Sequence, residues 1–251
     1  MTDRVQTNFV QQAAGLGLQL TERQLEQFEV YYALIIEWNE KMNLTGITER
    51  DAVYEKHYYD SLTLVSALDL AGSNSLVDIG SGAGFPSVPL AIVFPHLRVT
   101  IIDALAKRIR FLEEVTARLG LGKVSCLHSR AEDAARDKNH RDAYDIATAR
   151  AVARLAVLNE FCLPFVRPGG LFVAMKGTDI DSELRESRFS LSKLNGKLTG
   201  VKQLTLPGEG AERHLVVCEK TGPTPAAYPR KPGMPLKSPL VAPTIGISSR
   251  S

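Results

Sequence analysis

The chain has 251 residues, of which 44% are hydrophobic and 23% are charged, as in an ordinary globular protein. No stretch approaches the roughly 18 consecutive apolar residues of a membrane span, and the start MTDRVQTNFVQQ lacks the pattern of a secretory signal. We therefore expect a cytoplasmic protein with one main domain. Three widely spaced cysteines, Cys126, Cys162 and Cys218, suggest neither a disulfide framework nor a metal site, so we expect them in the core.

The first seventy residues predict a helical N-terminal cap, residues 1–72. Thr21 and Gln24 have the spacing of a capping box, and apolar residues recur after them at helical intervals. These signals predict a helix over residues 22–41. A second start signal at Thr48 and Asp51 opens another helical segment, and Gly72 stands where that segment should end.

From Ser75 the pattern changes to short β-rich runs that alternate with amphipathic segments. The runs are SLVDIG, RVTIIDA, KVSCLHS, AYDIATARA and GGLFVAMKG. This alternation predicts βαβ units, hence an α/β doubly wound parallel sheet with helices on both faces. The predicted helices cover residues 87–94, 106–119 and 153–165, with a short one near Glu132. The runs KLTGVKQLTL and RHLVVCEK then predict an antiparallel hairpin at the sheet edge, closing a domain over residues 73–220.

The last segment, residues 221–251, differs in composition from the rest of the chain. It has four basic residues, no acidic residue and seven of the 13 prolines, while the first 220 residues carry 26 basic and 28 acidic groups. So many prolines argue against regular helix or sheet and predict an extended or disordered strap. A basic strap would suit a phosphate-rich partner, and a merely solvated tail is an equally good interpretation.

A glycine-rich turn follows the first predicted strand in the stretch LVDIGSGAGFP. Gly80, Gly82 and Gly84 stand where a doubly wound sheet places its ligand crevice, and Asp78 lies near the end of the strand. Glycines there permit positive φ and a close approach of the backbone to a bound molecule. A tight turn without a ligand is the alternative.

The spacing of this turn favours S-adenosylmethionine over a dinucleotide. A dinucleotide fingerprint needs a third glycine where this chain has Phe85. Asp103, at the end of the second strand, could hydrogen-bond a ribose in either kind of site. The acid of SRAED after the third strand and the edge hairpin favour S-adenosylmethionine.

Several motifs in fixed order resemble the ribosomal RNA small subunit methyltransferase G family, also called glucose-inhibited division protein B. They are WNEKMNLTGITERDAVYEKHYYDSL, DIGSGAGFPSVPLAIVFP, IIDALAKRIRFLEEV, SRAED, ATARAVARL, MKG and ERHLVV. The resemblance covers residues 37–220. It implies a class I S-adenosylmethionine-dependent methyltransferase fold, with seven strands of which the last is antiparallel. It also implies methyl transfer to N7 of a guanine in small-subunit (16S) rRNA.

The resemblance transfers site residues position by position. Gly80 and Phe85 correspond to cofactor-loop contacts, Asp103 to the ribose-facing acid, and Arg150 to the arginine after the fourth strand. Two departures are Ser87, where glycine is expected, and Ala104, where many members have serine. The expected cofactor contacts are Asp78, Gly80, Gly82, Gly84, Phe85, Asp103, Ala104, Ala131, Glu132 and Arg150.

The chemistry of N7 requires no catalytic acid or base, because this nitrogen carries an in-plane lone pair and no proton. Catalysis would then depend on proximity and orientation. The chain also lacks the N/D-P-P-Y/F motif that methyltransferases of exocyclic amines use. We therefore assign no catalytic residue and expect Arg150 and Lys176 to position the substrate. The alternative for Arg150 is an ion pair with a nearby acid, and the alternative for Lys176 is an ordinary position at the end of a strand.

The remaining polar candidates have weaker signals. His57, Asp60 and Ser61 share one helix face and are expected to form a packing cluster, so His57 is not assigned as a general base. Arg213 and His214 open the last strand, as either a solvated edge or an RNA contact. Arginines that could border the crevice are Arg108, Arg110, Arg118, Arg130, Arg150 and Arg154.

The expected partner is small-subunit rRNA or the assembled small subunit, bound by a monomer without a membrane. Three alternatives remain at this stage. One is a methyltransferase of the same fold acting on another RNA atom or on a small molecule. The others are a non-enzymatic nucleotide-binding module and, more distantly, a nicotinamide oxidoreductase.

Overall fold

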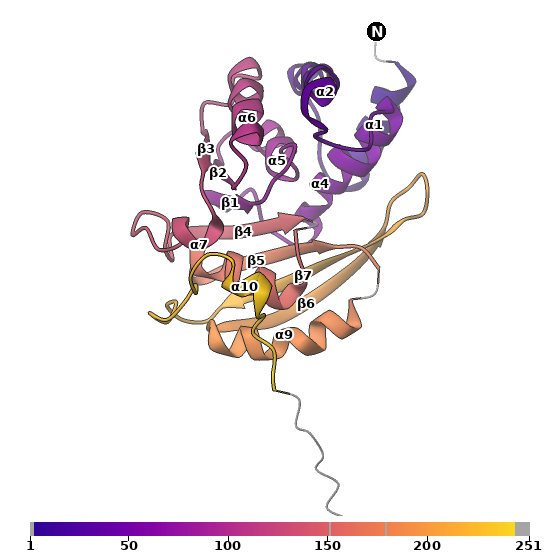
Figure 1. Ribbon diagram of the computed structural model, residues 1–251. Helices are drawn as coiled ribbons and strands as arrows, with labels where there is room; N and C mark the ends of the chain where they lie inside the picture. Colours follow the sequence, from indigo (N-terminus) through magenta and orange to yellow (C-terminus); the bar gives the residue numbers. More distant parts are fainter. Residues whose placement is uncertain (1–2, 151, 179, 244–251) are drawn as a thin grey trace, which may run out of the picture.

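A seven-stranded sheet organises the chain, with helices on both of its faces (Figure 1). The computed structural model describes residues 3–150, 152–178 and 180–243. The strand order is β3-β2-β1-β4-β5-β7-β6. The strands are β1 (Ser75–Ile79), β2 (Arg98–Asp103), β3 (Val124–His128), β4 (Tyr144–Arg150), β5 (Val166–Lys176), β6 (Gly196–Thr205) and β7 (Glu212–Lys220).

The pairing of the strands confirms the predicted α/β class. β1 to β5 pair in parallel, and β7 is antiparallel to both β5 and β6. The hairpin predicted after Lys176 is therefore confirmed, with β6 at the edge and the last strand, β7, inserted beside β5. Because the parallel strands point the same way, the residues after β1, β2 and β4 meet at one edge of the sheet.

The N-terminal helices pack on the face that also carries α5 (Ser87–Val93) and α6 (Ala106–Arg118) (Figure 1). α2 (Glu22–Met42) begins at the predicted capping box of Thr21 and contacts both α5 and α6. α1 (Arg4–Gly15) lies within the predicted helical cap, although its bounds were not predicted, and it adds Phe9 to the same core.

The second N-terminal helical segment contains an irregular turn. It runs through α3 (Arg50–Val53), a π-helical turn (Tyr54–Tyr59), α4 (Asp60–Leu62) and a 3-10 turn (Thr63–Ser66). π-helical turns are rare and recur at functional sites, because the wider turn displaces side chains from regular helical positions. This turn carries His57 to the edge of the sheet where β1 and β4 end.

The opposite face of the sheet is covered by α7 (Ala131–Ala134), α8 (Leu155–Cys162) with the 3-10 turn Leu163–Phe165, α9 (Asp181–Lys193) and α10 (Met234–Lys237). α9 was not predicted. Among its buried residues are Ser187 and Ser190, so its packing face lacks the apolar periodicity that would have indicated a helix.

The tail lies against this second face as far as α10, and the chain that follows α10 then leads away from the domain (Figure 1). Residues 221–233 have no regular helix or strand, and α10 then forms one helical turn despite the many prolines. Proline is tolerated in a first helical turn because its missing N–H would have no partner there, and Pro235 occupies such a position.

Cys162 and Cys218 are buried, as predicted, and Cys126 is half-buried; all three are free thiols. Over the described residues, no helix combines the length and apolar character needed to cross a membrane.

Candidate functional site

Three adjoining hollows lie at the carboxyl ends of β1, β2 and β4. The central hollow has a volume of roughly 430 Å³, the inner hollow roughly 150 Å³ and the outer hollow roughly 280 Å³. The central and inner hollows share Gly80 and Asp103 among their lining residues, and the central and outer hollows share His57 and Arg150. We call the three together the cleft.

A wider hollow of roughly 850 Å³ lies at the opposite edge, where Ser75, Arg98 and Tyr144 begin their strands. Its lining includes Gly122 but none of Gly80, Gly82 and Gly84. Ligands of doubly wound sheets bind at the carboxyl ends of the strands, so the cleft is the candidate site.

The glycine-rich turn forms the floor of the central hollow. Gly82 has φ +63°, and no atom lies within 4 Å of the position that a Cβ would take there. Gly84 has φ +100°, but a Cβ on it would lie 2.5 Å from Oη of Tyr31, whose hydroxyl donates to the carbonyl of Ala83. Gly82 thus leaves bare backbone toward the cleft, whereas Gly84 lets α2 pack against the turn.

Asp78 lies beneath the turn and does not line the cleft. Its side chain is fully buried, and its Oδ2 accepts from the backbone N–H of Ser87 at 3.3 Å. Burial raises the pKa of Asp78 to about 7, although hydrogen bonds from Ser87 and Ser81 oppose the shift. Ser87, where a glycine was expected, also hydrogen-bonds Ser81 through its hydroxyl at 3.0 Å.

Asp103 stands between the glycine-rich turn and the start of α6. Its Oδ1 accepts from the N–H of Leu105 at 2.9 Å, and its Oδ2 lies 3.4 Å from the N–H of Gly82 and from Nη1 of Arg108. The side chain is 3% exposed and borders both the central and inner hollows. A carboxylate held in this way presents remaining lone pairs to a ligand hydroxyl.

The inner hollow is mostly apolar. Glu132 is buried there, and its Oε1 accepts from the backbone N–H of Gly233 at 2.8 Å. A flat apolar ring with polar edges would suit such a lining. The apolar residues that border it are Ile79, Ile102, Ala104, Ala131, Val152, Phe161 and Leu236.

Arg150 is the centre of a polar cluster between the central and outer hollows. Its Nη1 donates to the carboxylate of Asp60 and to the carbonyl of Lys56, both at 3.1 Å. Its guanidinium lies 4.8 Å from the ring centroid of Phe85. Arg213 makes a second ion pair with Asp60 at 3.2 Å. We call Arg150, His57, Asp60 and Arg213 the arginine corner.

His57 is neutral in this environment. Burial and the charge of Arg150 lower its pKa to about 3. Nδ1 lies 3.2 Å from Nη2 of Arg150 and 3.1 Å from the carbonyl of Lys56, and Nε2 lies 2.9 Å from the hydroxyl of Thr45, so both ring nitrogens are engaged. The ring also stacks on Phe85, with centroids 4.4 Å apart. The expected packing cluster therefore borders the cleft.

Lys176 is held at the rim of the outer hollow. Its ammonium lies 2.9 Å from the carboxylate of Glu183 and donates to the carbonyl of Ala153 at 3.0 Å. His214 pairs with the carbonyl of Gly177 at 2.7 Å. Among the arginines considered from sequence, Arg108, Arg130 and Arg150 border the cleft, while Arg110, Arg118 and Arg154 do not.

The structure brings most of the expected cofactor residues together and adds others. Asp78 and Gly84 lie outside the lining. Lining residues missed from sequence include Thr45, whose stretch belongs to a quoted motif, and Leu236, which has no sequence signal. The expected residues that do line the cleft are Gly80, Gly82, Phe85, Asp103, Ala104, Ala131, Glu132 and Arg150.

Comparisons with known proteins found relatives that match most of this chain. A family model described as rRNA small subunit methyltransferase G matches residues 24–216. Proteins named ribosomal RNA small subunit methyltransferase G from Brevibacillus brevis and Halalkalibacterium halodurans are 51% and 52% identical, over 93% of this chain and 98% of each relative. A solved geranyl diphosphate methyltransferase in complex with SAM is 15% identical, with a TM-score of 0.51 over 70% of this chain and 92% of that one, a likeness of fold alone.

Proposed function

This chain belongs to the rRNA small subunit methyltransferase G family, and on that premise we propose that it transfers the methyl group of S-adenosylmethionine to N7 of a guanine in small-subunit rRNA. The single observation that carries the proposal beyond family membership is the cleft. It consists of an apolar inner hollow, a glycine-lined centre and a polar outer hollow that share lining residues at one edge of the sheet.

The residues present suit S-adenosylmethionine. The open space over Gly82 admits a ligand against the backbone, and the carboxylate of Asp103 is placed to accept from ribose hydroxyls. The inner hollow beside Ala131 and Glu132 suits an adenine ring. When bound, S-adenosylmethionine supplies an electrophilic methyl group on a sulfonium.

The polar groups of the cleft orient the reactants and remove no proton. Guanine N7 has none to lose, and His57 is neutral with both ring nitrogens already hydrogen-bonded. Arg150 borders both the central and outer hollows and is fixed by Asp60, Lys56 and Phe85. We assign Arg150 the positioning of the target guanine against the methyl donor.

The outer hollow suits a guanine that arrives on an RNA backbone. Four basic side chains and one acidic side chain line it, which favours an anionic strand near its mouth. The basic lining residues are Lys56, Arg150, Lys176 and Arg213. We propose that a monomer acts in the cytoplasm, where an assembled small subunit supplies most of the positioning surface.

The test is methyl transfer from radiolabelled S-adenosylmethionine to small subunits purified from cells that lack the corresponding gene. We expect label in the rRNA, with mass mapping placing it on N7 of one guanine. Label on another atom or on ribosomal protein would contradict the proposed acceptor. Absence of label, with S-adenosylmethionine bound, would favour a cofactor-sensing protein instead.

A further inference from the structure

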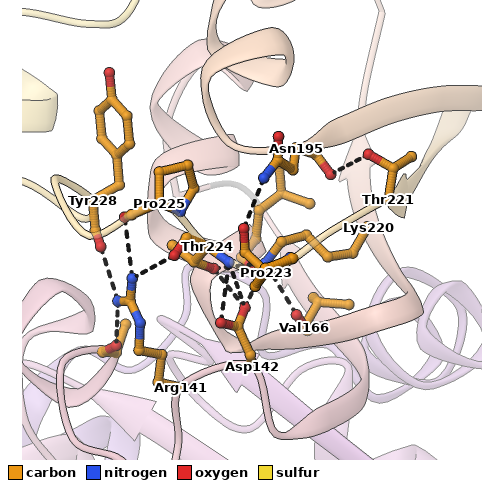
Figure 2. Close-up of polar contacts among 12 residues, drawn as sticks. Arg141, Asp142, Val166, Asn195, Lys220, Thr221, Pro223, Thr224, Pro225 and Tyr228 are labelled. Atoms are coloured by element: carbon orange, nitrogen blue, oxygen red, sulfur yellow. Dashed lines mark hydrogen bonds and ion pairs between the residues drawn. The ribbon is translucent and has the colours of Figure 1, made fainter.

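The tail is anchored to the domain immediately after β7 (Figure 2). The fully buried ammonium of Lys220 lies 2.7 Å from Oδ1 of Asp142 and donates to the hydroxyl of Thr224 at 2.6 Å. The guanidinium of Arg141 donates to three tail carbonyls, those of Thr224 and Tyr228 at 2.9 Å and of Pro225 at 3.1 Å. These contacts fix the path of the backbone over residues 220–228.

A second anchor holds the tail on α8. Arg230 binds both carboxylate oxygens of Glu160, with the shortest distance 2.6 Å from Nη2 to Oε2. The backbone N–H of Arg230 also donates to Glu160 at 2.8 Å, and the Glu160 side chain is fully buried. Arg230, one of the three cations in the described part of the tail, is thus engaged inside the molecule, while Lys231 and Lys237 are exposed.

The two anchors deliver α10 to the inner hollow. Gly233 donates its N–H to Glu132, and two residues later Pro235 is buried. Leu236 then lines the inner hollow together with Phe161 of α8, yet 56% of its surface is exposed. A leucine that is held at the mouth of an apolar hollow and remains half uncovered is poised to contact a ligand in it.

We propose that the C-terminal turn forms one wall of the adenine subsite, with Leu236 covering the adenine ring of S-adenosylmethionine. This rests on the proposed function, because it assigns the inner hollow to adenine. The turn strengthens cofactor binding, and the hydrogen bond between Gly233 and Glu132 positions both the turn and the Glu132 side chain. Removing the apolar contact weakens binding of any ligand that carries adenine.

The experiment measures binding of S-adenosylhomocysteine and of methylthioadenosine, which lacks the amino acid part, by calorimetry on the full chain. We expect Leu236→Ala to weaken both about tenfold, the effect of losing most of one apolar contact. Met234→Ala is the matched control, since Met234 is a large exposed apolar side chain of the same turn that does not line the hollow. It should bind both nucleosides like the unmodified chain.

Two outcomes would overturn the inference while leaving the function intact: equal affinity of Leu236→Ala and the unmodified chain, or an equal loss in Met234→Ala. Failure of the unmodified chain to bind either nucleoside would instead overturn the proposed function, and the inference with it. Hydrogen exchange on the unmodified chain gives an independent readout. Exchange of residues 233–238 should slow when S-adenosylhomocysteine is added, and unchanged exchange would also count against the contact.

Discussion

The two ends of the cleft are built by different means. At the outer end, Asp60 binds both Arg150 and Arg213, so ion pairs and hydrogen bonds fix the arginine corner before any ligand arrives. At the inner end the lining is mostly apolar, and one wall comes from a turn about a hundred residues further along the chain than Glu132. Polar groups that are already held in place can orient a reacting nucleobase, whereas apolar contacts can strengthen the binding of a cofactor. Changes at the two ends should therefore separate turnover from cofactor binding.

The largest effect should come from Arg150→Ala. The variant loses the hydrogen bonds to Lys56, His57 and Asp60, so the residues that line the outer hollow are no longer held in place. Methyl transfer should therefore fall on the order of 100-fold. Single-turnover methylation with saturating cofactor measures this loss. The affinity for S-adenosylhomocysteine should change far less.

Arg150→Lys separates charge from shape at the same position. Lysine keeps the positive charge beside Asp60 but lacks the planar fork that reaches several acceptors, so it should restore only part of the rate. Full recovery would mean that charge alone suffices. If Arg150→Ala lost only cofactor affinity and kept its rate of methyl transfer, the outer end would not control turnover separately from cofactor binding.

A smaller effect is expected where the ends meet, at Gly82. Gly82→Ala places a methyl group in the open space above the turn, and should weaken S-adenosylhomocysteine binding about tenfold through crowding. Gly120→Ala is the matched control, because Gly120 has φ +66°, equally open surroundings, and a position away from the cleft. Calorimetry measures the affinity of both variants.

Both glycine variants should lose about 1 kcal/mol of unfolding free energy, since an L-residue is strained at positive φ. Urea unfolding checks this shared cost. Similar affinities in the two variants would show that the turn at Gly82 does not approach the cofactor.

The sequence predicted the middle of the cleft better than its ends. The glycine-rich turn and Asp103 follow strands whose alternation is visible in the residues, and a parallel sheet brings such positions together. The sequence did not predict the position of Leu236. Part of the tail is held through carbonyl groups that bind Arg141, which any residue carries, and the pairing of Arg230 with Glu160 joins residues 70 positions apart with no pattern that links them. The same holds for α9, which packs partly through serines.

A third effect concerns the buried acid beneath the turn. The pKa of Asp78 is about 7 in the folded chain and near 3.8 when unfolded, so between about pH 4 and 7 the folded state holds a proton that the unfolded state has lost. Asp78 therefore contributes at most about 4 kcal/mol to the free energy of unfolding at low pH. This contribution disappears as pH rises through 7. Asp78→Asn should remove it.

Urea unfolding of Asp78→Asn and the unmodified chain at matched pH isolates this group from all others. The variant should gain unfolding free energy relative to the unmodified chain as pH rises from about 4 to 7. Affinity for S-adenosylhomocysteine should be alike in the two proteins near pH 6, because Asp78 does not line the cleft. A parallel pH dependence of both proteins would mean that Asp78 ionises normally.

The smallest effect should be the pH dependence of turnover at the arginine corner. With a pKa of about 3, His57 keeps the same charge from about pH 5 to pH 8, so single-turnover methylation should show no inflection from it. His57→Gln should lower the rate modestly, by losing the stack on Phe85, and leave the profile flat. A rise in rate with pH that disappears in His57→Gln would identify His57 as a base. Such a base would be needed by an exocyclic amine, a ribose hydroxyl or a ring N–H, which must lose a proton, so a flat profile in both proteins favours a ring nitrogen that carries no proton as the acceptor.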